Sequence, residues 1–531
     1  MTLLRLDAAF WRRQTAGLRR ANAGPASRTA LFCDLFSMPA AAKMQALYAL
    51  ALRGLGVSSV VLMQAPNPTC ERLYRAAGDV RFAYLNDFID DTMRRAASNE
   101  ADAVLAGIKS SNDLLSYSRN SVRSGRNVLS RVLRLFRQGH LELNIPEHRS
   151  TLSKWLAESI VSGDAVRRLI AELAPDIGIF LERGYTPAGE VFDTCLAMGV
   201  DTVQWLGAPQ ADRLILKRYK MATRDQHPLS LADETWCNLK VSAWPKDNDD
   251  AVLRTLRAHY NDGTWYNRQK LQEGKRIQSR ESVIESLKLD PAKKTAVIFS
   301  HILYDATFFY GESLFQDYEE WLVETVREAV KNPNLNWIVK VHPVNIWRSK
   351  MDGVAMEQLE VAALRKALGE LPPHVKVLTA DTDINTYSLF SLIDYGLTVR
   401  GTIGLELPCF GIPVVTAGTG RYSGRGFTID PRTREEFANV LGRLHEFGRL
   451  NEAETRLARQ YAYGTFFLRP MPMESFVFDY EAATYGLPEL GANVFPANGK
   501  TFGSKFGEDI SQVAAWIANG ESEDFIFEGQ Q

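Results

Sequence analysis

The 531-residue sequence has few cysteines and no long apolar run. Its five cysteines are scattered and form no C-x-x-C pair, a pattern more typical of buried thiols in a reducing compartment than of disulfides or a zinc site. No stretch approaches the 18 consecutive apolar residues of a transmembrane helix. Arginines interrupt the short apolar stretches of residues 1–20, unlike the continuous apolar core of a signal peptide. We therefore expect a cytoplasmic protein.

The sequence also lacks an excess of charge of either sign. Its 62 lysines and arginines nearly balance 63 aspartates and glutamates, which gives a net charge of −1. This balance argues against a generally basic, nucleic-acid-coating surface, so we expect no nucleic-acid partner. The content of 45% apolar and 24% charged residues is ordinary for a globular protein. At about 100–200 residues per domain, the length predicts two or three domains.

Strand-like and helix-like segments alternate along both halves of the chain. In the first half, the apolar run 29–36 predicts a buried strand, and Pro39 opens an alanine-rich helix that stops near Gly54. Further strands are predicted at 58–63, 176–181, 202–206, 294–300, 336–341, 375–378, 395–399 and 412–416. Such βαβ units build parallel sheets. We therefore predict an α/β protein of two Rossmann-like, doubly wound domains facing a cleft.

Three loops in the second half follow the carboxyl ends of predicted strands, where doubly wound sheets bind their ligands. They are Ser300–His301, Lys340–Pro343 and Arg400–Glu406. In the third loop we expect Thr402 to cap a short helix, whose free N–H groups and dipole favour a phosphate. Gly404 lies in the same turn, and Glu406 could hydrogen-bond a ribose diol. The alternative is an ordinary helix start beside tightly packed strands.

Basic side chains accompany these loops. His342, fixed by Pro343 at a strand end, could donate to a phosphate, and Lys340 on the same strand face adds positive charge. The glycine-rich loop 418–426 carries Arg421 and Arg425, which could clamp a diphosphate or a sugar carboxylate. The alternatives are a structural histidine and a mobile surface loop.

Three segments together resemble the capsule polysaccharide biosynthesis family, bacterial glycosyltransferases of the two-Rossmann-domain GT-B type that include Kdo transferases. They are Lys340-Val-His-Pro343, Gly401-Thr-Ile-Gly-Leu-Glu406 and Phe410-Gly-Ile-Pro-Val-Val415. The resemblance implies that His342, Pro343, Thr402 and Glu406 hold a sugar nucleotide. It covers residues 293–430, whereas the first half matches only as a generic βαβ pattern.

The sequence departs from the sialyltransferase-like relatives of this family, because it lacks their acidic motif followed by glycine that supplies the catalytic base. The candidates for a general acid or base therefore lie at strand ends. They are Glu182 and Asp34 in the first half and Asp305 on the facing loop, each with a purely structural role as the alternative.

We expect no metal and no other cofactor. Asp381-Thr-Asp383 spells the metal-binding triplet of another glycosyltransferase class, but Asp383 precedes a predicted helix at Ile384 and fits an ordinary N-cap. The eight histidines show no metal-ligand spacing.

Two basic amphipathic stretches, residues 3–20 and 119–137, could lie on an anionic membrane. The first places Phe10 and Trp11 on its apolar side. Core-packed helices with a solvated basic face are the alternative. The resemblance favours a peripheral contact with the inner face of the cytoplasmic membrane.

We therefore predict a metal-independent glycosyltransferase of capsule or surface polysaccharide synthesis, which transfers a sugar from a nucleotide-activated donor to a glycan or lipid-linked glycan. The alternatives are a polyol-phosphate transferase or sugar-nucleotide 2-epimerase on the same scaffold, or a non-catalytic polysaccharide-assembly protein. The predicted segments are a basic N-terminal segment at 1–27, an acceptor domain with a helical insertion at 28–238, a connector at 239–292, a nucleotide-sugar-binding domain at 293–465, and a clasp and tail at 466–531. We expect the last residues of this tail, 521–531, to form a loose end.

Overall fold

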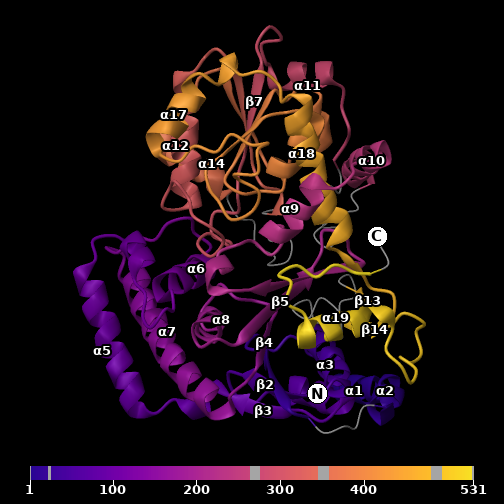
Figure 1. Ribbon diagram of the computed structural model, residues 1–531. Helices are drawn as coiled ribbons and strands as arrows, with labels where there is room; N and C mark the ends of the chain where they lie inside the picture. Colours follow the sequence, from indigo (N-terminus) through magenta and orange to yellow (C-terminus); the bar gives the residue numbers. More distant parts are fainter. Residues whose placement is uncertain (1, 22–25, 263–274, 345–357, 480–492, 529–531) are drawn as a thin grey trace. The chain divides into compact units, whose positions relative to one another are not determined.

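The computed structural model describes residues 2–21, 26–262, 275–344, 358–479 and 493–528. The chain divides into two units (Figure 1). The first unit comprises residues 1–132, 142–224 and 468–531, and the second comprises residues 133–141 and 225–467. The described part of the predicted connector 239–292 thus belongs to the second unit, and nearly all of the predicted clasp belongs to the first.

The first unit contains a seven-stranded sheet in the order β12-β6-β5-β4-β1-β2-β3. Its parallel strands are β1 (Arg28–Cys33), β2 (Val57–Met63), β3 (Arg81–Tyr84), β4 (Ile177–Phe180) and β5 (Asp201–Gly207). At one edge, β6 (Arg213–Tyr219) pairs antiparallel with β5, and β12 (Met471–Pro472) pairs antiparallel with β6. Since β1 lies between β2 and β4, the strand order reverses at β1 and β4, as in a Rossmann fold.

Alternating side chains of these strands fill two cores. Ala30 and Phe32 of β1 belong to one buried cluster, and Leu31 and Cys33 belong to the other. The first cluster includes residues of α1 (Thr2–Gln14), α3 (Pro39–Gly54), α4 (Pro68–Ala77) and α19 (Glu508–Asn519). The second includes residues of α7 (Pro146–Leu173) and α8 (Ala188–Ala197). Strands covered on both faces read as continuous apolar runs, which is why β1, β2, β4 and β5 could be predicted.

The remaining elements of the first unit lie around this sandwich. They are α2 (Ala16–Ala21), α5 (Asp91–Gly107), the part of α6 (Ser124–Phe136) up to Val132, and the antiparallel pair β13 (Phe476–Asp479) and β14 (Asn493–Pro496). We expected a loose end at 521–531, and over its described part that expectation is wrong. Asp524 is fully buried, 2.9 Å from the amine of Lys217 and 3.2 Å from the guanidinium of Arg469.

Apolar side chains of the N-terminal helix α1 pack in the interior of the first unit. Trp11 is fully buried and meets Phe502 edge-on with ring centroids 5.6 Å apart, whereas Phe10 is 49% exposed. In the second basic stretch, Arg123 forms a buried ion pair with Asp193 at 2.9 Å. Trp11 and Arg123 therefore belong to the interior and not to a surface that could meet lipid. No helix in the described part of the chain has the length and apolar character that crossing a membrane requires.

The second unit contains a five-stranded, wholly parallel sheet in the order β11-β10-β7-β8-β9. The strands are β7 (Thr295–Phe299), β8 (Asn336–Lys340), β9 (Val375–Leu378), β10 (Tyr395–Thr398) and β11 (Val414–Thr416). This is again the Rossmann order, and it reverses between β7 and β10. Two α/β domains with parallel sheets are therefore confirmed.

Helices cover both faces of this second sheet. One core cluster includes Ala296 and Ile298 with residues of α12 (Tyr318–Lys331), α14 (Leu359–Leu368) and α17 (Arg434–Gly442). The opposite cluster includes Val297 and Ile338 with residues of α11 (Arg280–Leu287), α15 (Thr386–Phe390) and α16 (Ile403–Glu406). Figure 1 shows α12, α14 and α17 on one side of β7 and α18 on the other. A third cluster joins α9 (Asp233–Val241) and α10 (Lys246–Asp262) to α18 (Glu452–Tyr463).

Candidate functional site

A cavity of about 350 Å³ opens at the carboxyl ends of β7, β8 and β10, where the strand order of the second sheet reverses. This is the position at which open α/β sheets bind ligands. All three predicted loops contribute to it. The residues that line it are His259, Tyr260, Phe299, Ser300, His301, Ile302, Lys340, Val341, His342, Pro343, Thr386, Thr398, Gly401, Thr402, Ile403, Glu406 and Arg421.

His301, after β7, is held in one orientation. Its ring stacks on Tyr318 with centroids 4.3 Å apart, and its Nε2 accepts a hydrogen bond from the backbone N–H of Val399 at 3.1 Å. Burial, and then the nearby Arg400 guanidinium, lower the pKa of His301 well below its usual value. The ring is therefore neutral, with its proton on Nδ1. Because Nε2 is occupied, Nδ1–H is the donor that this side chain can offer a ligand.

His342, after β8, is linked to the first loop. Its backbone N–H donates to Ser300 Oγ at 2.9 Å, and its Nδ1 accepts from the backbone N–H of Val344 at 3.2 Å. Pro343 and Ser300 also line the cavity. Since Nδ1 is an acceptor, the ring proton lies on Nε2.

Lys340 is the last residue of β8, and only 5% of its surface is exposed. Its amine forms no hydrogen bond or ion pair within the described residues. Burial, and secondarily the charge of Lys275, lower the pKa of Lys340 to about 7. The cavity wall therefore contains a lysine that has no carboxylate partner in the described part of the chain.

The turn after β10 differs from its predicted form. Thr402 has helical backbone angles (φ −56°, ψ −30°) and its side chain caps nothing, and the following helix α16 has only four residues. The expected N-cap is thus wrong. However, the backbone N–H groups of Thr402 and Ile403 donate to no acceptor among the described residues, and both residues line the cavity. The turn therefore offers two free amides to a ligand without a long helix behind them.

Glu406 lies at the end of this turn, almost fully buried, and accepts a hydrogen bond from the Tyr260 hydroxyl. Burial raises the pKa of Glu406 to about 8, and the charge of Arg421 only partly offsets the effect. Its carboxyl group is therefore mostly protonated at pH 7. In that form it can both donate and accept hydrogen bonds, which suits a pair of ligand hydroxyls.

Gly404 is not among the residues that line the cavity. A Cβ at this position would lie 1.9 Å from the hydroxyl of Tyr422, which itself donates to the carbonyl oxygen of Gly401 at 2.6 Å. Glycine is therefore needed here so that Tyr422 can support the turn. The structure gives Gly404 a role in packing.

The two arginines of the glycine-rich loop lie in different surroundings. Arg421 lines the cavity, and its guanidinium donates to the carbonyl oxygen of Arg400 at 3.1 Å, with no ion pair among the described residues. Arg425 lies outside the lining and forms an ion pair with Asp233 at 2.7 Å. The loop itself is anchored: the carbonyl oxygen of Gly420 accepts from the backbone N–H of His227 at 2.7 Å. A joint clamp by both arginines is not what the structure shows.

Six lining residues lie outside the loops predicted from the sequence: His259, Tyr260, Phe299, Ile302, Thr386 and Thr398. The first two come from α10, inside the predicted connector. Asn385 Nδ2 donates to the carbonyl oxygen of Tyr260 at 3.0 Å, which ties this helix to α15. Thr398 could have been found, because it ends a predicted strand. No local signal marked His259 or Tyr260.

The lining combines cationic or N–H donor groups with one carboxyl group. Lys340, Arg421, His301, His342 and the turn amides provide donors, and Glu406 is the only acidic residue among the lining residues. Such a site favours an anion, because several hydrogen-bond donors converge on it. In the described residues, neither Lys340 nor Arg421 is neutralised by a carboxylate.

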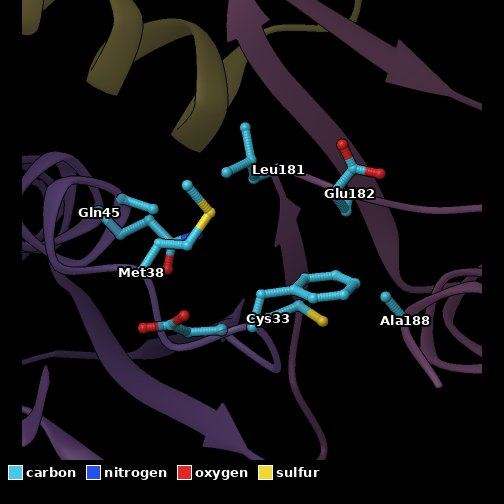
Figure 2. Close-up of a pocket in the computed structure, with 9 residues that line it drawn as sticks. Cys33, Met38, Gln45, Leu181, Glu182 and Ala188 are labelled. Atoms are coloured by element: carbon cyan, nitrogen blue, oxygen red, sulfur yellow. The ribbon is translucent and has the colours of Figure 1, made fainter. Parts of the chain in front are cut away.

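The predicted acid–base candidates lie outside this cavity. Asp34 and Glu182 follow β1 and β4 at the reversal point of the first sheet and line a hollow of only about 10 Å³ there. Figure 2 shows the Glu182 carboxylate turned away from Cys33. Asp34 accepts hydrogen bonds from Tyr74 and from the backbone of Ser37, and burial raises its pKa to about 6. Asp305 lies 3.6 Å from Arg134.

The D-x-D triplet also differs from expectation. Helix α15 begins at Thr386, and its N-cap is Asn385, whose side chain accepts from the backbone N–H of Tyr387 at 2.8 Å. Asp383 is therefore not the cap. Within the described residues, no three His, Cys, Asp or Glu side chains gather closely enough to form a metal site.

No protein-family model matches the sequence, and no curated protein matches it significantly. Among solved structures, the β-Kdo 2,4 transferase KpsC of Thermosulfurimonas dismutans is 16% identical, over 61% of this chain and 85% of that chain, with a TM-score of 0.35. The UDP-GlcNAc 2-epimerase of Neisseria meningitidis, solved with bound UDP-GlcNAc, is 11% identical, over 82% of this chain and 95% of that one, with a TM-score of 0.28. The chain is thus distantly similar in structure to Kdo transferases and UDP-GlcNAc 2-epimerases, and at this level the likeness concerns the fold.

Proposed function

We propose that the chain is a glycosyltransferase that binds a nucleotide-activated sugar in the cavity of the second unit and transfers the sugar to a glycan or lipid-linked glycan of a bacterial surface polysaccharide. The observation that carries the proposal is the pair of cavity cations, Lys340 and Arg421, beside two unsatisfied backbone amides at a strand-order reversal. The three sequence segments that resemble the capsule polysaccharide family supply the reaction class.

In this proposal the phosphate of the donor lies between Lys340, Arg421 and the amides of Thr402 and Ile403. The protonated carboxyl group of Glu406 hydrogen-bonds the ribose hydroxyls. Transfer breaks the bond between the anomeric carbon and the phosphate oxygen, and negative charge develops on the departing phosphate. Donors fixed before the reaction stabilise that charge without reorganisation, a contribution that is commonly the largest one in such sites.

A base must accept the proton of the acceptor hydroxyl. Of the three candidates, we assign this role to Glu182, because it follows β4 at the reversal point of the first sheet. Asp34 is nearly fully buried and already accepts two hydrogen bonds, and Asp305 lies beside Arg134. Contact of the protein with the cytoplasmic face of a membrane remains part of the proposal.

The test uses the two arginines of one loop as a matched pair. Titration calorimetry with a panel of uridine, cytidine and guanosine sugar nucleotides should find at least one ligand of the unmodified protein. The variant Arg421→Ala should weaken its binding by about 10- to 100-fold, the range for a lost charge-assisted contact of about 1.5–3 kcal/mol. Arg425→Ala, which removes an arginine bound to Asp233, should bind normally.

Equal effects of the two substitutions, or no binding by any nucleotide, would refute the proposal. Once a ligand is known, incubation with and without acceptor glycans separates the enzyme classes. Conversion of the sugar nucleotide without any acceptor would instead assign a 2-epimerase, and binding without turnover would assign a non-catalytic role.

A further inference from the structure

Lys340 is unusual among the lining residues because it is a buried cation with no partner of opposite charge among the residues that the structure describes. It ends strand β8, between Phe299 of β7 and Leu378 of β9 in the sheet. It is 5% exposed, and its amine makes no hydrogen bond within the described residues while its side chain borders the cavity. A charged amine in such a place loses hydration without receiving compensation, which favours its neutral form.

Two of the charged groups around Lys340, Lys275 and Arg421, are positive. Lys275 approaches from the segment before α11, where its amine donates to the carbonyl oxygen of Ala380 at 3.2 Å, and Asp381 partly offsets its charge. Arg421, His301 and His342 border the same cavity. Glu406 is the acidic group of the lining, and it is engaged by Tyr260.

An incoming phosphate would be the counter-charge that Lys340 lacks. We propose that the cavity takes up one proton at the Lys340 amine when it binds a phosphate-bearing ligand, so that affinity falls as the pH rises above neutrality. This inference rests on the proposed nucleotide site and concerns how that site is regulated. In the empty cavity the lowered pKa of about 7 leaves the amine largely neutral under mildly alkaline conditions.

The size of the effect follows from the proton balance. At pH 8, a group with a pKa of about 7 holds only about 0.1 proton, so full protonation on binding takes up about 0.9 proton. The dissociation constant then rises by nearly tenfold between pH 8 and pH 9. Nucleotide phosphates have a second pKa of about 6 and are already ionised in this range.

Other groups in the cavity can be separated from Lys340. The range from pH 8 to 9 lies well above the usual titration of imidazole. Burial lowers the pKa of His259 to about 3 and the pKa of His301 well below its usual value, so neither ring titrates in this range. Glu406 does titrate nearby, because burial raises its pKa to about 8. The variant Glu406→Gln removes its contribution.

The experiment is titration calorimetry of the full chain with uridine 5′-diphosphate and with cytidine 5′-monophosphate at pH 8, in Tris and in phosphate-free buffers of low ionisation enthalpy. In the Glu406→Gln background, the slope of the observed enthalpy against the buffer ionisation enthalpy should correspond to an uptake of about 0.9 proton. When Lys340→Arg, whose cation does not titrate, is added to this Glu406→Gln background, binding should persist with no proton uptake and a nearly flat affinity between pH 8 and 9.

The outcomes separate this inference from the proposed function. If either nucleotide binds with no proton uptake in the Glu406→Gln background, or if the double variant Lys340→Arg, Glu406→Gln takes up the proton as before, the inference is overturned while the nucleotide site stands. If neither nucleotide nor any sugar nucleotide of the panel binds at any pH, the proposed function fails and the inference fails with it. The measurement on Glu406→Gln needs no change at Lys340, so it remains decisive even if Lys340→Arg does not fold.

Discussion

Glu190, in the first turn of α8, should make the stability of the protein depend on pH. The side chain is fully buried, and its Oε1 accepts hydrogen bonds from Ser159 at 2.6 Å, Thr186 at 3.0 Å and Asn127 at 3.2 Å. Its Oε2 is buried without a hydrogen-bond partner in the described residues. Burial raises the pKa of Glu190 from 4.5 to about 7, although these hydrogen bonds oppose the rise.

The sign and size of the effect follow from this shift. Between pH 4.5 and 7 the unfolded chain has lost the proton that folded Glu190 retains, so the free energy of unfolding falls as the pH rises. The difference of about 2.5 pH units corresponds to about 3.4 kcal/mol, lost progressively and complete above pH 7. Glu190→Gln keeps an oxygen for the three donors and cannot ionise.

Urea denaturation of both proteins at pH 5 and pH 8 tests the argument. At pH 5 the two free energies of unfolding should agree within about 1 kcal/mol, and at pH 8 the variant should be more stable by about 3 kcal/mol. Contributions of other titrating groups cancel in this comparison. Glu172 is exposed, so Glu172→Gln is the control. Its difference in free energy of unfolding from the unmodified protein should be the same at pH 5 and pH 8. A constant difference between Glu190→Gln and the unmodified protein at both pH values would refute the reasoning.

Two further predictions concern buried contacts. Asp524→Asn leaves the cations of Lys217 and Arg469 buried without their carboxylate, so urea denaturation should show a loss of about 3–5 kcal/mol, and an unchanged midpoint would contradict the buried ion pair. Gly404→Ala places a Cβ against Tyr422 and should lower the free energy of unfolding, measured by thermal unfolding, by about 1–3 kcal/mol. The control Gly448→Ala, whose Cβ would meet nothing within 4 Å, should change it by no more than about 0.5 kcal/mol. Equal losses in the two variants would exclude the packing role of Gly404.

The strands that could be predicted from the sequence are those whose own residues are apolar enough to explain their burial. β1, β2, β4, β5 and β7 are apolar runs covered by helices on both faces, so their composition alone predicts them. β6 was not predicted, because it contains Lys217 and Arg218. Lys217 can be buried there only because Asp524 lies beside it. A local sequence pattern cannot predict a partner about 300 residues away in the chain.

The candidate site divides in the same way. Residues at strand ends, such as His301, Lys340 and His342, could be placed together because parallel strands end at one edge of a sheet. Tyr260 could not, because it reaches the cavity from a helix in what read as a connector. Arg425 differs from Arg421 because it forms an ion pair with Asp233, and the spacing of the two arginines does not predict that contact.

The return of residues 468–531 to the first unit has a consequence for synthesis on the ribosome. The second unit ends at residue 467 and has its full sheet before the last segment emerges, whereas the first unit lacks β12, α19 and Asp524 until then. Domains generally fold as units during synthesis, and those with exposed strand edges are prone to aggregate. The domain whose synthesis begins first is thus completed last. Until residues 468–531 emerge, one edge of β6 is unpaired and Lys217 lacks the carboxylate of Asp524.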